Sequence, residues 1–325
     1  MATRIIGTGR GLPEKVVTND DLSKFMETSD EWIASRTGIR ERRLATTETT
    51  AGMAAEASKK ALAMAGMNPE ELDLIIVGTI TNDYVTPSCA CEVQSMIGAT
   101  NAMAFDVNAA CTGFMVALNT AHVYMLSGKY KNALVIGAET LSKIMDWNDR
   151  STCVLFGDGA GAAVLSFDKN ENGSRGLISY TQGADGASGM QLAGQNRTNN
   201  NPFVSTSKEL KYVSMDGQEV YKFAVSKVPA SILQVLEEAD MKVEDISYFI
   251  LHQANIRIIQ SVAKRLKVDV DKFPISLDHC GNVSAASVPI LLDEVNEKGL
   301  LKKGDKIVVA GFGGGLTWSA GIIEW

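Results

Sequence analysis

Ala65-Gly-Met67-Asn-Pro-Glu70-Glu71-Leu72-Asp-Leu-Ile75-Ile76-Val77 is repeated, in altered form, as Ala239-Asp-Met241-Lys-Val-Glu244-Asp245-Ile246-Ser-Tyr-Phe249-Ile250-Leu251. The two stretches lie 174 residues apart. The same separation maps Asn108 onto Asn282, and it maps Ala133–Gly137 onto Ile307–Gly311 without a gap. Because three blocks share one register, the sequence indicates an internal duplication.

A further pair of apolar stretches closes the two halves, and it aligns at a different separation. Residues 162–165 and 320–323 lie 158 residues apart, so the first half carries about 16 extra residues near 140–156. We expect this segment, the cap insertion, to form a loop over a functional site. The sequence divides into an N-terminal half at residues 1–170 and a C-terminal half at residues 171–325.

Each half is predicted to run strand, helix, strand, helix, strand, strand. The expected strands Leu74–Val77 and Tyr248–Leu251 are too uniformly apolar to have a face in water. Such strands belong to sheets that are covered on both faces. The sequence therefore predicts an α/β fold built from two similar halves.

Cys111 stands between an expected buried strand, Ala102–Asn108, and an expected helix that runs from about Cys111 to Ser127. The helix is indicated by apolar residues spaced three and four apart: Phe114, Ala117, Leu118, Ala121 and Met125. A helix amino terminus stabilises a thiolate, so we expect a lowered pKa and a nucleophile at Cys111. A buried structural cysteine is the alternative interpretation.

Two more reactive side chains are expected where strands end. His252 follows the strand Tyr248–Leu251, and Asn282 follows an expected strand at Phe273–Leu277. The carboxyl ends of strands are where α/β folds place their chemistry. A thiol, an imidazole and a carboxamide together suit acyl transfer through a thioester. A cysteine hydrolase, a condensing enzyme and a non-catalytic acyl-binding protein all remain open.

Composition narrows the class of protein further. The chain has 325 residues and a formal net charge of −7, which argues against general nucleic-acid binding. No apolar stretch approaches the length of a membrane span, and the first residues lack the regions of a secretory signal, so we expect a cytosolic protein with no membrane partner. Five cysteines without a Cys-x-x-Cys pair argue against a disulfide framework or a zinc site.

Four motifs resemble the signatures of β-ketoacyl-acyl-carrier-protein synthase III, a family of the thiolase superfamily. They are Asp106-Val-Asn-Ala-Ala-Cys111-Thr-Gly-Phe, His252-Gln-Ala-Asn255, Gly281-Asn282-Val-Ser and Gly311-Phe-Gly-Gly-Gly315. The resemblance covers nearly the whole chain. It implies a thiolase-like five-layered αβαβα fold of two duplicated halves and a homodimer.

The resemblance also implies a two-stage reaction. Cys111 takes an acyl group from acyl-CoA, with the N–H groups of Cys111 and Gly314 as the oxyanion hole. Malonyl-acyl carrier protein then loses carbon dioxide, while His252 and Asn282 donate hydrogen bonds to its thioester carbonyl. The product is a 3-oxoacyl carrier protein, and neither a cofactor nor a metal is required. The pathway is expected to be the initiation of fatty acid synthesis, with starter condensation in a specialised polyketide pathway as the alternative.

The same resemblance suggests which residues bind the substrates. The expected CoA contacts are Thr28, Trp32, Arg36, Arg150 and Asn255, with Trp32 and Arg150 stacking on the adenine. A basic patch for the acidic carrier protein is expected at Lys222, Arg257, Lys264 and Arg265, which Lys227 extends. Thr86 is expected to line the primer pocket. For these aromatic and basic residues, ordinary packing and a solvated charged face are the alternatives.

Overall fold

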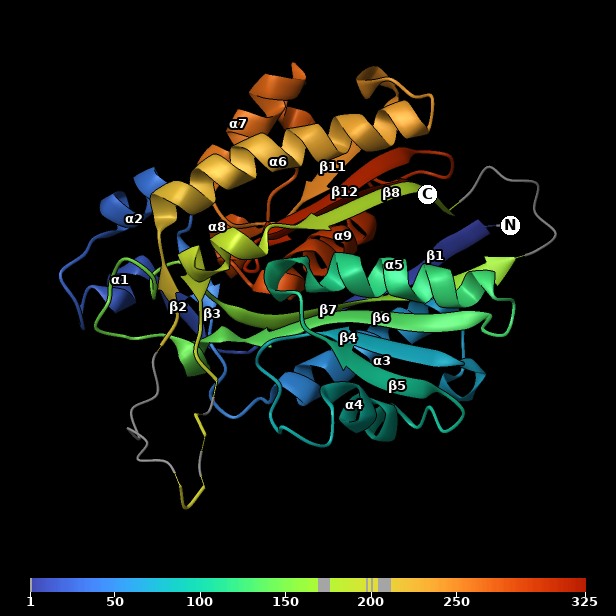
Figure 1. The fold of residues 1–325 in the computed structure, drawn as a ribbon, viewed down its shortest axis with the longest axis horizontal. Helices are drawn as coiled ribbons and strands as arrows, with labels where there is room; N and C mark the ends of the chain where they lie inside the picture. The colour runs from blue at the N-terminus through green and yellow to red at the C-terminus, as the bar shows by residue number, and fades with distance from the viewer. Residues whose placement is uncertain (1, 169–175, 197, 200, 204–211) are drawn as a thin grey trace.

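The computed structural model describes residues 2–168, 176–196, 198–199, 201–203 and 212–325 (Figure 1). The expected boundary between residues 170 and 171 lies outside these described residues. The two main sheets hold the strands β1 (Ala2–Gly11), β4 (Leu74–Gly78), β5 (Met103–Val107), β6 (Asn132–Thr140), β7 (Asp158–Asp168), β8 (Gly176–Ala184), β11 (Tyr248–Leu251), β12 (Lys306–Gly313) and β13 (Thr317–Glu324). The main helices are α2 (Asp30–Thr37), α3 (Thr50–Ala65), α4 (Cys89–Ile97), α5 (Gly113–Leu126), α6 (Gly217–Glu238), α7 (Ile256–Leu266) and α9 (Ser287–Glu297).

The order of the strands confirms the duplication. One sheet has the order β1-β7-β6-β4-β5, and the other, read from the matching edge, has the order β8-β13-β12-β11. Leu74 pairs with Ala133 and Tyr248 pairs with Ile307, so both partners shift by 174 positions between the halves. Ala133 pairs with Leu165 and Ile307 pairs with Ile323, which reproduces the separation of 158 for the closing strands.

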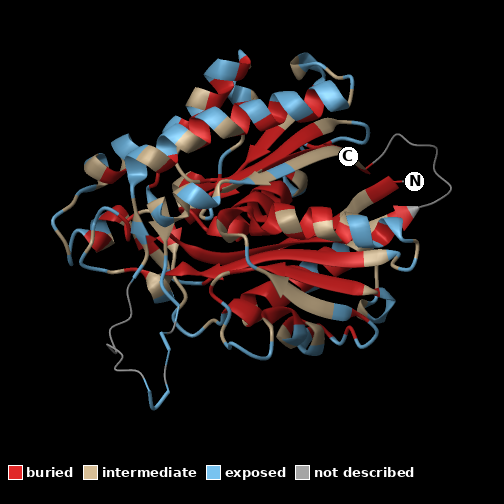
Figure 2. Ribbon diagram, viewed as in Figure 1, coloured by how far each residue is buried: buried red, intermediate tan, exposed pale blue. Residues whose placement is uncertain are grey.

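The helices complete five layers, as expected. Figure 1 shows α6 and α7 on one outer face, α3 and α4 on the opposite outer face, and α5 and α9 between the two sheets. Three hydrophobic cores fill the spaces between the layers, and Figure 2 shows that most of the strands in the two sheets are buried. The apolar face expected of the helix after Cys111 is confirmed, because Phe114, Leu118 and Met125 are buried in the central core.

Strands with two apolar faces serve two cores at once. In β4, Ile75 and Val77 pack into the outer core, while Leu74 and Ile76 pack into the central core. Successive side chains of a strand point to opposite faces of the sheet, so a strand between two helical layers needs apolar residues at every position. This explains why these segments show no alternation with polar residues.

The expected strand at Phe273–Leu277 is wrong. Residues 274–276 are irregular, and a short helix, α8 (Leu277–Cys280), follows them. Proline at position 274 has no N–H to give to a neighbouring strand. The N–H groups of Ser276 and Leu277 instead donate to the Gln253 side-chain oxygen, at 3.1 and 3.2 Å. The second sheet therefore has four described strands where the first has five.

The described helices include none that is long and apolar enough to cross a membrane.

Candidate active site

Cys111 lies where the two halves touch. It is buried in a 3-10 turn, Ala110–Thr112, directly before α5. The carboxyl end of β12 approaches from the second half so closely that a Cβ at Gly313 would lie 2.6 Å from the Cβ of Cys111. No real Cβ fits at that distance, so glycine at position 313 is what lets β12 approach Cys111.

The expectation of a lowered thiol pKa is wrong for this structure. Burial raises the pKa of Cys111 to about 11, because a thiolate there loses its hydration. Hydrogen bonds from the Ser284 hydroxyl and from the backbone N–H groups of Cys111 and Gly314 act in the opposite direction. These two N–H groups are those expected to form the oxyanion hole, and they lie close enough to the sulfur to affect its pKa.

His252 follows β11, as predicted. Its backbone N–H donates to Ala310 on the neighbouring strand at 2.8 Å, and its ring meets that of Phe312 edge-on, with centroids 5.1 Å apart. Burial lowers the pKa of His252 to about 3, so the imidazole is neutral and carries one N–H. Its Nδ1 has no hydrogen-bond partner among the described residues.

Asn282 is held so that its amide nitrogen is available. The backbone N–H of Ser284 donates to the Asn282 side-chain oxygen at 2.9 Å, which leaves the NH₂ group as the free donor. The cap insertion fixes the main chain, because Asn282 donates to Leu155 at 2.9 Å and accepts from Gly157 at 3.0 Å. The inserted segment thus lies at the site, as expected, and also supports one of its residues.

Cys111, His252 and Asn282 line one cavity of about 1070 Å³, which confirms that the fold brings them together. Gly314, Thr86 and Asn255 line it too. No hydrogen bond joins His252 to Asn282 in the described part of the chain, and the Asn282 oxygen is already occupied by Ser284. A hydrolase would use the asparagine to orient the histidine. The geometry instead leaves both side chains as neutral donors to the cavity.

The residues expected to bind CoA form a second group. The Arg36 and Arg150 guanidinium carbons lie 4.7 and 5.2 Å from the centre of the Trp32 ring. These three residues are not among those that line the cavity, but Asn255 connects the groups, because its side-chain nitrogen donates to the Arg36 carbonyl at 3.1 Å. The Thr28 hydroxyl is buried without a hydrogen-bond partner among the described residues.

The residues of the expected basic patch lie at the surface, but they differ in how far their charges are paired within the chain. Arg257, Lys264 and Arg265 all lie exposed on α7. The Lys222 side chain forms an ion pair with Glu219 at 2.6 Å, so part of its charge is neutralised within the chain. Lys227 lies 4.4 Å from the centre of the Trp318 ring.

Sequence reasoning missed Glu139 and Ser284. Glu139 is fully buried at the end of β6, and Ser284 donates to its carboxylate at 3.2 Å. An acidic residue two positions after the apolar run Ala133–Gly137 was the available signal, since a charge at the end of a buried strand requires partners.

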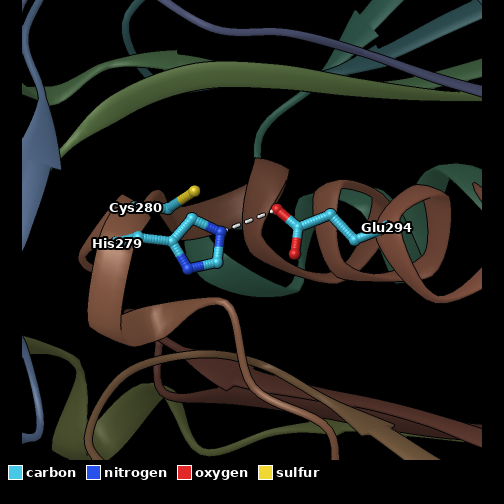
Figure 3. Close-up of side chains that lie close together, drawn as sticks. All are labelled: His279, Cys280 and Glu294. Atoms are coloured by element: carbon cyan, nitrogen blue, oxygen red, sulfur yellow. Dashed lines mark hydrogen bonds and ion pairs between the residues drawn. The ribbon is translucent and has the colours of Figure 1, made fainter. Parts of the chain in front are cut away.

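His279 belongs to an ion-paired group beside Asn282. Its ring nitrogens lie 2.8 Å from Asp278 and 2.9 Å from Glu294, and Figure 3 shows Cys280 next to the pair. His279, Cys280 and Glu294 are close enough to hold a metal ion. The Asp278 contact, with that of Glu294, raises the pKa of His279 to about 12. An imidazolium that donates from both nitrogens acts as an ion-pair partner, in keeping with a structural histidine.

The fold is that of a thiolase-type enzyme, and Cys111 lies buried at the cavity where its two halves meet. Comparisons with known proteins identify the family within the thiolase fold to which the chain belongs. Residues 105–197 match the family model for 3-oxoacyl-[acyl-carrier-protein] synthase III, and residues 236–325 match its C-terminal model. The chain belongs to the β-ketoacyl-acyl-carrier-protein synthase III family and is an enzyme of the acyltransferase class.

Individual relatives are similar to this chain over nearly its full length. A β-ketoacyl-[acyl-carrier-protein] synthase III of Clostridium novyi is 54% identical over 99% of this chain and 98% of its own. The crystal structure of 3-oxoacyl-[acyl-carrier-protein] synthase III from Aquifex aeolicus superposes with a TM-score of 0.93, at 45% identity and with full coverage of both chains. The priming β-ketosynthase of the R1128 polyketide pathway gives a TM-score of 0.90 at 34% identity, covering 99% of this chain and 96% of its own.

Proposed function

We propose that this chain joins an acyl group from acyl-CoA to malonyl-acyl carrier protein, with loss of carbon dioxide, and so initiates fatty acid synthesis. The observation that carries the proposal is the arrangement of the cavity. It presents one thiol, a neutral imidazole and an amide whose oxygen is already bonded, so that two uncharged donors face one nucleophile.

Each residue then has a distinct task. Cys111 attacks the acyl-CoA carbonyl, and the N–H groups of Cys111 and Gly314 stabilise the oxyanion. His252 and Asn282 donate to the thioester carbonyl of the malonyl group. They stabilise the enolate that forms when carbon dioxide leaves, and this enolate attacks the acyl-cysteine. A neutral donor suits this role because it strengthens its hydrogen bond as negative charge develops on the oxygen.

An intact-mass measurement tests the proposal. Incubation with acyl-CoA alone is expected to give a stable acyl adduct on Cys111 that disappears when malonyl-acyl carrier protein is added. Rapid loss of the adduct in water would instead identify a hydrolase. Absence of any adduct would leave an acyl-binding protein.

CoA recognition is part of the proposal. The two guanidinium groups around Trp32 offer the stacking and phosphate-pairing chemistry of an adenine nucleotide. A purine stacked between Trp32 and Arg150 requires about 7 Å between the ring and the guanidinium group, which is twice the usual contact distance. The guanidinium carbon now lies 5.2 Å from the ring centre, so Arg150 must move outward when CoA binds. The Thr28 hydroxyl has no hydrogen-bond partner among the described residues, but it is buried, so it becomes available to the same ligand only when its surroundings move.

The size of the primer can be tested by comparing acyl-CoA substrates. Thr86 is a small residue in the cavity wall, which favours room for primers longer or more branched than acetyl. Single-turnover acylation with acetyl-, isobutyryl- and hexanoyl-CoA tests this, and strict acetyl preference would contradict it. The structural similarity to the priming ketosynthase of a polyketide pathway supports starter condensation in such a pathway as the alternative function.

A homodimer is also proposed. Strand β5 lies at the edge of its sheet, and exposed apolar side chains surround it on α4, β5 and α5: Met96, Met103, Val123, Tyr124 and Leu126. An open edge with adjacent apolar surface is typical of a strand that pairs with a second copy.

A further inference from the structure

Glu139 is a buried carboxyl group that the proposed chemistry leaves without a role. No cation forms an ion pair with it in the described part of the chain, and the nearby Lys143 is paired with Asp83. Burial raises the pKa of Glu139 to about 7, the largest contribution being loss of hydration. An uncompensated acid beside a nucleophile is a functional candidate, because a protein gains nothing in stability from burying it.

The two oxygens of this carboxyl group differ. Oε2 accepts hydrogen bonds from the Thr79 hydroxyl at 3.3 Å, from the Ile80 N–H at 3.2 Å and from the Thr81 hydroxyl. Oε1 accepts from the Ser284 hydroxyl at 3.2 Å. A proton that arrives at Glu139 therefore has its place on Oε1, the oxygen that faces Ser284.

Ser284 lies between Glu139 and Cys111. Its hydroxyl contacts the carboxylate on one side and hydrogen-bonds the Cys111 sulfur on the other. The backbone of Ser284 has a φ of +47°, a left-handed conformation that residues other than glycine rarely adopt and that concentrates at functional sites. The same residue holds the oxygen of Asn282.

One hydroxyl hydrogen cannot serve both neighbours at once. When Glu139 is ionised, Ser284 donates to the carboxylate and accepts from the thiol. When Glu139 is protonated, its own O–H donates to Ser284, whose hydrogen turns toward a thiolate. The charge of Glu139 also disfavours ionisation of Cys111 and of Cys89. The charge of either group therefore disfavours ionisation of the other.

We propose that Glu139 holds the proton of Cys111 during the acyl-enzyme stage and that the Ser284 hydroxyl carries it between them. This rests on the proposed function. In acylation the Sγ–acyl bond forms, the carbon–sulfur bond of acyl-CoA breaks, the thiol proton passes to Glu139, and the CoA thiolate takes a proton from water. In condensation the new carbon–carbon bond displaces the Cys111 thiolate, which recovers its proton from Glu139 while carbon dioxide leaves.

The pH dependence of single-turnover acylation, followed by intact mass, tests this relay. In the wild-type protein the rate is expected to rise with pH and level off above about pH 7, where Glu139 is ionised. Glu139→Gln should lose this inflection, and its rate at pH 7 should fall on the order of 100-fold. An unchanged profile in Glu139→Gln would overturn the relay alone, whereas absence of any wild-type adduct would overturn the proposed function and the relay with it.

Two further variants separate proton transfer from a structural role. Thr79→Val removes one donor to the carboxylate but leaves Glu139 and Ser284 in place, so the inflection should move to higher pH with the same plateau. Ser284→Ala should lose the inflection as Glu139→Gln does. The variant that combines Glu139→Gln with Ser284→Ala should be no slower than the slower of the two single variants, because each substitution interrupts the same proton-transfer path. Additive losses, or an unmoved inflection in Thr79→Val, would overturn the proposal.

Discussion

At the scale of single residues, His252 and Asn282 should separate the two stages of the reaction. Replacing either by alanine removes one donor to the enolate, which costs roughly 3–4 kcal/mol of barrier, or on the order of 100- to 1000-fold in the condensation rate. Acylation of Cys111 does not use these donors and should stay within a few-fold of wild type. Carrier-protein condensation and acyl-adduct formation, measured on the same preparations, check the split. Equal losses in both stages would contradict the assigned roles.

Glu139 should also make the free energy of unfolding depend on pH. Its pKa rises on folding from 4.5 to about 7, so the ionised form is disfavoured in the folded state. The free energy of unfolding contributed by this group is therefore greatest at low pH and falls as the pH rises through the window from 4.5 to 7. At about 1.4 kcal/mol per pKa unit the change amounts to about 3 kcal/mol.

Glu139→Gln removes this titration. Relative to wild type, the variant should gain about 3 kcal/mol in free energy of unfolding between pH 4 and pH 8, a difference in which the constant cost of the amide cancels. Denaturant unfolding at the two pH values measures it. Glu56→Gln, at an exposed acid on α3, is the control and should show little change. Parallel stability curves for wild type and Glu139→Gln would contradict the raised pKa.

That Cys111 and His252 meet at one cavity could be predicted, because Cys111 precedes a recognisable helix and His252 follows a recognisable strand; Asn282 lines the same cavity although the strand expected before it does not form. The thiol pKa could not be predicted. The helix amino terminus is visible in the sequence, but the burial that outweighs it depends on how closely Gly313 and Ser284 approach from the other half. Glu139 was missed for the same reason, since its partners come from residues 79–81 and 284.

At the scale of elements, the contact between β12 and the turn before α5 should tolerate no side chain. A methyl group at Gly313 would meet the Cβ, N and Cα of Cys111 at 2.6, 2.9 and 3.1 Å, and backbone atoms cannot move away cheaply. Gly313→Ala is therefore expected to displace the nucleophile and to abolish adduct formation. It should also cost about 1–3 kcal/mol of stability, as overpacking does.

The matched control is Gly186→Ala, where a Cβ meets nothing within 4 Å. Its acylation rate should equal that of wild type. Intact mass and thermal unfolding of the two variants are sufficient measurements. Normal acylation by Gly313→Ala would mean that the two halves are less tightly fixed than their contact requires.

The one wrong element shows where periodicity fails. Residues 273–277 are apolar enough for a strand, yet the Gln253 side chain takes the N–H groups of Ser276 and Leu277 that a strand would offer to its neighbour. That bond joins residues more than twenty positions apart. The paired elements that repeat at separations of 174 and 158 were predictable, because the duplication makes each half evidence for the other.

At the scale of the whole molecule, the chain is acidic overall but presents a basic helix face to solvent. Carrier proteins are acidic, so the exposed cations of α7 should act on the second stage alone. Arg257→Glu is expected to weaken use of the carrier substrate far more than acylation by acyl-CoA. Arg257 also donates to the Ser35 carbonyl at 2.9 Å, beside Arg36, so its replacement disturbs the CoA group as well.

Lys264→Glu is the sharper variant, because Lys264 is exposed on the same helix and no contact to the CoA group is seen for it. It should raise the KM for malonyl-acyl carrier protein several-fold and leave acylation unchanged. The effect should shrink as salt rises, since the Debye length falls from about 10 Å at 0.1 M to about 3 Å at 1 M. Lys59→Glu makes the same charge change on α3, in the opposite outer layer, and should alter neither stage. Equal effects of Lys264→Glu and Lys59→Glu would place carrier docking elsewhere on the molecule, because only net charge would then matter.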